Sequence, residues 1–122
     1  MRITFLDDSI PFDGLTAAGR ALGGAEKTVA ALAAALAARG HAVTVVNRTP
    51  VGLDLGGVRW QPLAEGAGGP CDLLVACRKP ALLGECRRAG RRVLLHLGPG
   101  RALARPETAR LLKRHPAAVA LV

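Results

Sequence analysis

Aromatic residues are scarce in this sequence: they make up 2% of it, and tyrosine is absent. Proteins that bind single-stranded nucleic acid stack the bases on aromatic side chains, so this shortage argues against that class. No hydrophobic run approaches the ~18 residues that a membrane-spanning helix requires. The chain also passes from Met1 straight into a strand pattern, without a signal peptide. Together these absences predict a cytoplasmic protein.

Cysteine and the common enzyme motifs are also poorly represented. Cys71, Cys77 and Cys86 form no C-x-x-C pair and match no zinc-site spacing, so we expect reduced, partly buried thiols. Gly14 and Gly19 have the spacing of a P-loop, but the Lys and the Ser or Thr that should follow are missing. The sequence contains no G-x-G-x-x-G after its first predicted strand, no H-E-x-x-H and no Ser–His–Asp order. It gives no support for a bound metal.

Positive charge, in contrast, is abundant. The chain has 17 Lys and Arg against 9 Asp and Glu, which gives a net charge of +8. The excess favours an anionic partner such as a membrane surface or a phosphorylated ligand. A composition biased towards Ala, Gly, Arg and Leu also explains it. Four arginines beside the apolar residues 81–83 form either a patch for the inner face of an anionic membrane or a solvated helix end: Arg87, Arg88, Arg91 and Arg92.

Strand and helix patterns alternate along the chain. Apolar runs bounded by turn residues predict six strands, at residues 2–6, 42–46, 58–62, 71–76, 91–96 and 117–122. Helical patterns begin within residues 23–26 and recur at 81–88 and 105–114, while residues 50–57 read as a turn. We expect Trp60 in the core, with a groove as the alternative. The alternation predicts one domain, residues 1–122, of α/β class: a Rossmann-like, doubly wound, mostly parallel sheet with helices on both faces.

The chain is organised around Gly23, Gly24 and the helix that begins there. Four apolar residues at helical spacing predict its buried face: Val29, Leu32, Ala33 and Leu36. Residues 7–22 form a long connection before it, and ligands of parallel sheets bind beyond the carboxyl ends of the strands. Two adjacent glycines let a phosphate or another anion approach the unpaired helix amides. The alternative is a flexible turn, with Glu26 present because carboxylates stabilise first turns.

Other polar residues are predicted to lie at the same edge of the sheet. His96 ends a strand and is a candidate general base or hydrogen-bond donor, with a structural role as the alternative. Asp7 and Asp8 end the first strand and either bind ligand hydroxyls or cap the loop. Arg78 and Lys79 follow another strand and are candidates for contacts to an acceptor, a sugar or an anionic substrate.

Several of these segments resemble the opening of GT-B glycosyltransferases, most closely the retaining group 1 (family 4) branch. The similarity rests on the first strand, on residues 23–26 (Gly-Gly-Ala-Glu) with the Ala- and Leu-rich helix after them, and on residues 39–41 (Arg-Gly-His). Further on, Arg78 after one strand and His96 after the next are similar to the strand–arginine–strand–histidine pattern of that family. The match spans nearly the whole chain.

The resemblance implies a two-domain enzyme that transfers a sugar from a nucleotide-sugar donor to an acceptor hydroxyl, in a cleft between two Rossmann-like halves. This chain corresponds to the N-terminal, acceptor-side half. By the family's pattern, Gly23 and Gly24 approach the donor diphosphate, and His96 is the catalytic-site residue near the transferred sugar. The implied reaction uses neither a metal nor another cofactor.

The sequence departs from the family in two ways. Leu97 follows His96, where many relatives carry an acidic residue. The C-terminal donor-binding domain is missing from these 122 residues, so we expect this chain alone to be an inactive fragment. Two other interpretations stay open: a stand-alone Rossmann-type nucleotide- or phosphate-binding module without catalysis, and a basic domain that docks onto nucleic acid or membrane.

Overall fold

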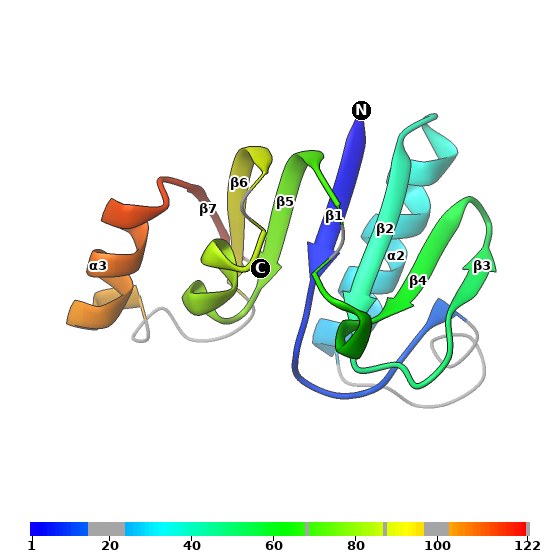
Figure 1. Cartoon of the computed structure of the whole chain (residues 1–122), viewed down its shortest axis with the longest axis horizontal. Coiled ribbons are helices and arrows are strands. Elements are labelled where there is room, and N and C mark those ends of the chain that lie inside the picture. Colours follow the sequence, from blue (N-terminus) through cyan, green and yellow to red (C-terminus); the bar gives the residue numbers. More distant parts are fainter. Residues whose placement is uncertain (15–23, 68, 87, 97–102, 122) are drawn as a thin grey trace.

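The computed structural model describes residues 1–14, 24–67, 69–86, 88–96 and 103–121. Within these ranges seven strands form one mixed, mostly parallel sheet in the order β3-β4-β2-β1-β5-β6-β7 (Figure 1). In chain order the strands are β1 (Arg2–Leu6), β2 (Ala42–Asn47), β3 (Leu53–Leu55), β4 (Val58–Pro62), β5 (Cys71–Cys77), β6 (Ala89–His96) and β7 (Ala118–Leu121). The helices are α2 (Gly24–Ala38) and α3 (Pro106–Arg114), with two 3-10 helices, η1 (Leu63–Glu65) and η2 (Pro80–Gly84). The predicted α/β class and mostly parallel sheet are confirmed.

The turn predicted over residues 50–57 is wrong in its middle. Leu53–Leu55 form a seventh strand, which pairs with β4 and is the one antiparallel strand of the described sheet. Gly56 and Gly57 join the two strands with φ of +59° and +81°. A two-residue hairpin turn of type I′ needs positive φ at both positions, which glycine adopts without strain. The Gly-Gly pair was therefore a hairpin signal.

The helix predicted over residues 81–88 is confirmed at its start but is wrong in its type and its length. The 3-10 helix η2 ends at Gly84, and β6 begins at Ala89, two residues before the predicted strand. Gly90 lies inside β6, where an added Cβ would sit 2.9 Å from the carbonyl oxygen of Asp72. The glycine permits the close approach of β6 to β5 and does not act as a helix breaker.

The core has one part on each face of the sheet. On one face, α2 packs Val29 and Ala33 against side chains that include Ile3, Phe5 and Val45. On the other, η2 packs Leu82 and Leu83, with Leu112 of α3 beside them, against a set that includes Leu6, Leu74 and Leu94. In Figure 1, α2 lies behind β1 and β2, and α3 stands at the β7 end of the sheet. Helical segments thus cover both faces, as predicted.

The buried face of α2 differs from the prediction in one respect. Val29 and Ala33 are fully buried, but Leu32 is 38% exposed. The buried position at the start of the helix belongs instead to the carboxylate residue Glu26. Trp60 is 2% exposed and packs edge-to-face on Phe12, with ring centroids 5.6 Å apart, so its assignment to the core is confirmed.

The strand order reverses direction between β1 and β5, and the space beyond their carboxyl ends is called the crevice here. The chain starts at the central strand β1, adds β2 and then β4 on one side, and crosses back to place β5 on the other side. The connections leave in opposite directions at the carboxyl ends of β1 and β5, which is where doubly wound sheets bind their ligands.

Candidate functional site

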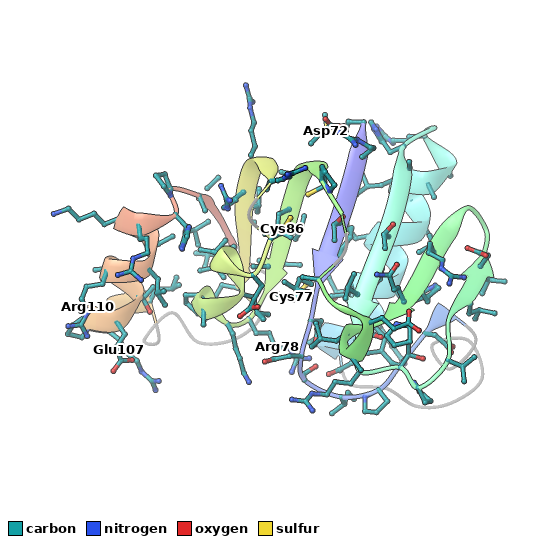
Figure 2. The ribbon with its side chains drawn as sticks, in the orientation of Figure 1. Asp72, Cys77, Arg78, Cys86, Glu107 and Arg110 are labelled. Atoms are coloured by element: carbon teal, nitrogen blue, oxygen red, sulfur yellow. The ribbon has the colours of Figure 1, made fainter. Side chains whose placement is uncertain are left out.

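The parallel register brings four polar residues to one edge of the sheet. Because β1 pairs with β2 and β5, and β5 pairs with β6, the residues at the carboxyl ends of these strands lie side by side: Asp7, Asn47, Arg78 and His96. Figure 2 shows Arg78 at this edge and Asp72 at the opposite end of β5. The predicted grouping of Asp7, Arg78 and His96 at a common edge therefore agrees with the register.

An ion pair between Glu26 and Arg78 crosses the β1–β5 crevice. The guanidinium of Arg78 donates to Oε1 of Glu26, whose side chain is 7% exposed, against 31% for that of Arg78. Burial raises the pKa of Glu26. Three effects outweigh burial and hold the pKa below its ordinary value: a hydrogen bond from the backbone N–H of Glu26, the hydrogen bond from Arg78 and the positive charge of Arg78. Glu26 is therefore ionised at neutral pH and belongs to the site.

The backbone at Arg78 is bent into an unusual conformation. Its φ is +70°, the one positive φ among the described non-glycine residues. Lys79 N donates to the carbonyl oxygen of Cys77 at 2.9 Å, which closes a three-residue turn around Arg78, and Arg78 N bonds the Leu95 carbonyl at 2.9 Å. A non-glycine residue at such a φ is strained, and residues of this kind concentrate at functional sites. The turn directs Arg78 towards α2.

Asp7 is a fully buried carboxylate with one satisfied oxygen. Its Oδ1 accepts the backbone N–H of Ser9 at 2.8 Å and also the Ser9 hydroxyl. Its Oδ2, like Nε of Arg78, is buried and has no hydrogen-bond partner within the described ranges. Buried polar atoms are nearly always paired, because an unpaired one costs about 1–3 kcal/mol. An acceptor and a donor are thus left unpaired at this edge among the described residues.

Both groups lie close to the thiol of Cys77. Burial, followed by the negative charge of Asp7, raises the pKa of Cys77 to about 12, and the positive charge of Arg78 acts in the opposite direction. The thiol is therefore neutral at physiological pH and is not a nucleophile. Because Leu6 pairs with Ala76 in the parallel register, Asp7 and Arg78 both lie beside this thiol.

The charged side chains at the rim of the crevice are more exposed to solvent. Lys79 Nζ lies 3.1 Å from Oδ1 of Asp8, and the Lys79 side chain is 59% exposed. Arg48 donates from Nε to the Asp8 carbonyl oxygen. An exposed pair of this kind contributes little to stability, so both side chains can reorganise around a ligand. Asp8 and Lys79 are therefore brought together as the sequence predicted, at the rim rather than in the crevice.

Asn47 is a residue of this edge that the sequence reasoning missed. It is fully buried, donates from Nδ2 to the Phe12 carbonyl at 2.6 Å, and accepts from Thr49 N at 3.0 Å. These bonds tie the connection after β1 to the end of β2. The sequence does contain a signal for this residue, because Asn47 is a polar residue that directly follows the apolar run of β2.

The remaining predicted residues differ in how the structure places them. Gly24 is the first residue of α2, and an added Cβ there would meet no atom of the described residues within 4 Å. Gly23 lies outside the described residues. His96 is the buried last residue of β6, beside Leu121 of β7 and one strand away from Arg78.

The proposed membrane patch is altered by the fold. Leu82 and Leu83, which would supply its apolar part, are buried in the core. Arg92 donates to the carbonyl oxygens of Leu83 and Cys86, each at 3.0 Å, and so caps the end of η2. Arg88 and Arg91 are exposed, whereas Arg87 lies outside the described residues. Membrane contact stays a prediction.

Within the described ranges, no group of three or more His, Cys, Asp or Glu side chains is arranged to hold a metal ion. No helix among those residues is both long enough and apolar enough to cross a membrane. No model of a known protein family matches the chain, and no curated protein sequence is similar to it.

Proposed function

We propose that this chain is the acceptor-side domain of a glycosyltransferase of the GT-B type, which passes a sugar from a nucleotide-sugar donor to an acceptor hydroxyl. The supporting observation lies at the carboxyl ends of β1 and β5, where Asp7 Oδ2 and Arg78 Nε are buried and have no hydrogen-bond partner among the described residues. A hydroxyl donates one hydrogen bond and accepts others, so it satisfies a carboxylate oxygen and a guanidinium N–H together. A sugar carries hydroxyl groups of this kind on several adjacent carbon atoms. A ligand of this class would complete the site.

The other residues of the edge take roles that follow from their positions. A Cβ added at Gly24 would meet no described atom within 4 Å, and the partial positive charge at the start of α2 favours a diphosphate there. Asp8 and Lys79 at the rim are suited to the hydroxyls and phosphates of an extended ligand. His96 would donate a hydrogen bond to the transferred sugar. Catalysis also requires a donor-binding domain, which these residues do not supply.

A glycine substitution tests this proposal in the complete polypeptide that carries the domain. Gly24→Val should abolish most sugar transfer, because the side chain fills the space in front of the helix amides. The fold should survive, since that space is empty. The measurement is the rate of product formation from UDP-glucose and other nucleotide-sugars, with the thermal midpoint recorded alongside.

Gly69→Val is the matched control, because Gly69 is also open to solvent but precedes β5 at the opposite edge of the sheet. It should leave the transfer rate unchanged. A Gly24→Val enzyme that transfers sugar at the wild-type rate would make residues 23 and 24 a simple turn and would remove the proposed diphosphate contact.

A stand-alone nucleotide- or phosphate-binding module is the second candidate. It is favoured by the same open start of α2, which needs no second domain to hold an anion. Thermal unfolding of the 122-residue chain separates the two candidates. Millimolar UDP should stabilise a stand-alone module by several degrees, whereas an acceptor-side domain, which contacts only the diphosphate, should bind UDP weakly and be stabilised much less.

A further inference from the structure

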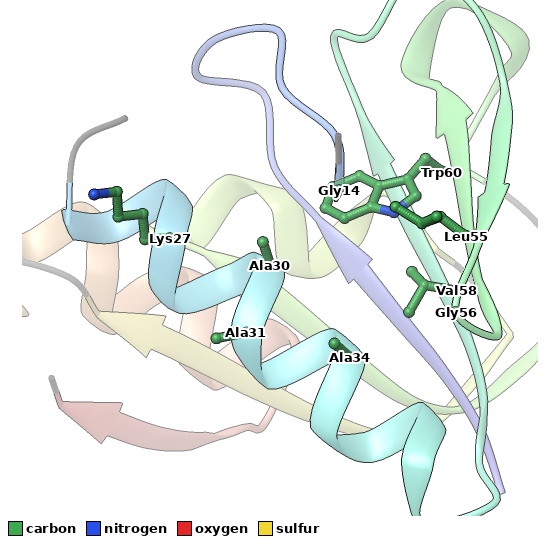
Figure 3. Close-up of a pocket in the computed structure, with 9 residues that line it drawn as sticks. All are labelled: Gly14, Lys27, Ala30, Ala31, Ala34, Leu55, Gly56, Val58 and Trp60. Atoms are coloured by element: carbon green, nitrogen blue, oxygen red, sulfur yellow. The ribbon is translucent and has the colours of Figure 1, made fainter. Parts of the chain in front are cut away.

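A groove runs between α2 and the β3–β4 hairpin, apart from the crevice. It has a volume of about 340 Å³. The helix contributes three alanines, Ala30, Ala31 and Ala34. The hairpin contributes three larger apolar side chains, which Figure 3 shows facing the helix: Leu55, Val58 and Trp60. The groove exists because the helix carries methyl groups where longer side chains would reach the hairpin. Its size lies within the range of ligand-binding pockets, about 300–1,000 Å³.

The walls of this groove are apolar and open to water. Apart from Lys27, each described lining residue is apolar or glycine, and Leu55 is 40% exposed. Contact between water and such walls is unfavourable, at roughly 25 cal/mol for each Å² of apolar surface. An apolar ligand that displaced this water would gain that free energy. The lining residues Lys27, Ala30 and Ala34 follow one another along one side of α2, so an extended hydrocarbon chain can contact all three (Figure 3).

Lys27 lines the end of the groove at the first turn of α2. The ion pairs among the described residues do not include Lys27, and the neighbouring Glu26 carboxylate is engaged by Arg78. The N-terminal turn of a helix adds partial positive charge at the same place. Among the described residues that line the groove, none is acidic, so none neutralises this charge. The end of the groove is therefore suited to an anionic group.

We propose that the groove binds a single-chain anionic amphiphile. Its hydrocarbon chain lies along Ala30 and Ala34, against Trp60, and its phosphate or carboxylate lies at Lys27. This inference goes beyond sugar transfer, because the groove shares none of its lining residues with the pair Glu26 and Arg78; its anionic end does lie at the same first turn of α2 as the proposed diphosphate contact.

The experiment uses the intrinsic fluorescence of Trp60, the only tryptophan of the chain. Octyl phosphate should change the emission saturably, whereas inorganic phosphate should not, and octanol should bind more weakly than octyl phosphate. Ala34→Leu fills the groove and should weaken binding about tenfold or more. Lys27→Gln should weaken the binding of octyl phosphate roughly fivefold, while leaving that of octanol unchanged.

Ala35→Leu is the matched control, since Ala35 is an exposed alanine of the same helix that does not line the groove. It should bind octyl phosphate as the wild type does. The proposal is overturned if octyl phosphate gives no saturable signal, if Ala34→Leu binds with wild-type affinity, or if the protein responds only to vesicles of an anionic phospholipid. Equal affinities for octanol and octyl phosphate would overturn the anionic part.

Discussion

Two carboxylates at the β1–β5 crevice have lost nearly all contact with water. Asp7 is fully buried and Glu26 is 5% exposed. Removing a carboxylate from water is costly unless charge and hydrogen bonds replace the lost hydration. Glu26 receives both from Arg78, whereas Asp7 keeps one oxygen without a partner. We therefore assign Glu26 a role in stability and propose Asp7 as the residue that recognises the ligand.

The Glu26–Arg78 pair predicts a specific dependence of stability on pH. Because the folded state lowers the pKa of Glu26 from its ordinary value of 4.5, its contribution is complete above that pH and is lost as the pH falls through the folded pKa. Glu26→Gln should therefore lower the free energy of unfolding by about 1–3 kcal/mol at neutral pH. The difference from the wild type should shrink as the pH falls below 4.5.

Urea unfolding from neutral pH down to acid, measured for both proteins, checks this prediction. Glu65→Gln is the control, because Glu65 is exposed in η1 and should change the free energy by less than about 0.5 kcal/mol. A difference between the wild type and Glu26→Gln that is the same at every pH would show that the carboxylate charge is not what matters.

The cysteines lead to a prediction about chemical reactivity. All three are buried, and the pKa of Cys77 is raised to about 12 from 9.0. Burial and the neighbouring Cys86 thiol also raise the pKa of Cys71. At pH ~8, iodoacetamide should therefore modify Cys77 in the folded chain roughly a thousandfold more slowly than in the urea-unfolded chain. Mass spectrometry of timed samples measures this, and rapid labelling of the folded protein would contradict the buried positions.

At the scale of secondary-structure elements, the sequence predicted those with strong local patterns. Strand β1 was predicted with its observed bounds, because its apolar run stops at Asp7. Strand β3 was missed because a three-residue strand has little periodicity of its own and depends on its pairing with β4. Glu26 was read as a first-turn carboxylate, because its partner Arg78 is 52 residues away. Contacts of this range cannot be read from local spacing.

The docking of α2 on the sheet gives a prediction for this scale. Ala33 is fully buried against the strands, whereas Ala35 is exposed. Ala33→Leu adds three carbon atoms to a packed interface and should lower the free energy of unfolding by about 1–3 kcal/mol. Ala35→Leu makes the same change in solvent and should alter it by less than about 0.5 kcal/mol. Thermal and urea unfolding of both variants measure the contrast, and equal effects would contradict the assigned helix face.

At the scale of the whole molecule, two features follow from the order of the strands. The crossing from β4 to β5 creates the crevice, and the parallel register brings residues from distant parts of the sequence to its edge. The sequence predicted this edge through the alternation of strands and helices. It could not predict which polar groups stay without partners, since that depends on side-chain positions across α2, β1 and β5.

The net charge of +8 offers a competing account, in which the surface arginines bind any anion without a defined site. Such binding would spread over the basic surface and would weaken steeply with salt. A site at the crevice would instead involve a few residues from separate elements, and substitution of one of them would remove it.

The most direct test is an NMR titration of the isotope-labelled chain with pyrophosphate and with methyl glucoside, at moderate salt. The account predicts that pyrophosphate shifts the amides of residues 24–27 and that methyl glucoside shifts those of Asp8, Glu26 and Lys79. The response to pyrophosphate should disappear in Gly24→Val. Shifts spread over the arginines of α3 and β6 and lost with added salt, or no shifts at the carboxyl edge, would contradict the assignment of the crevice as the ligand site.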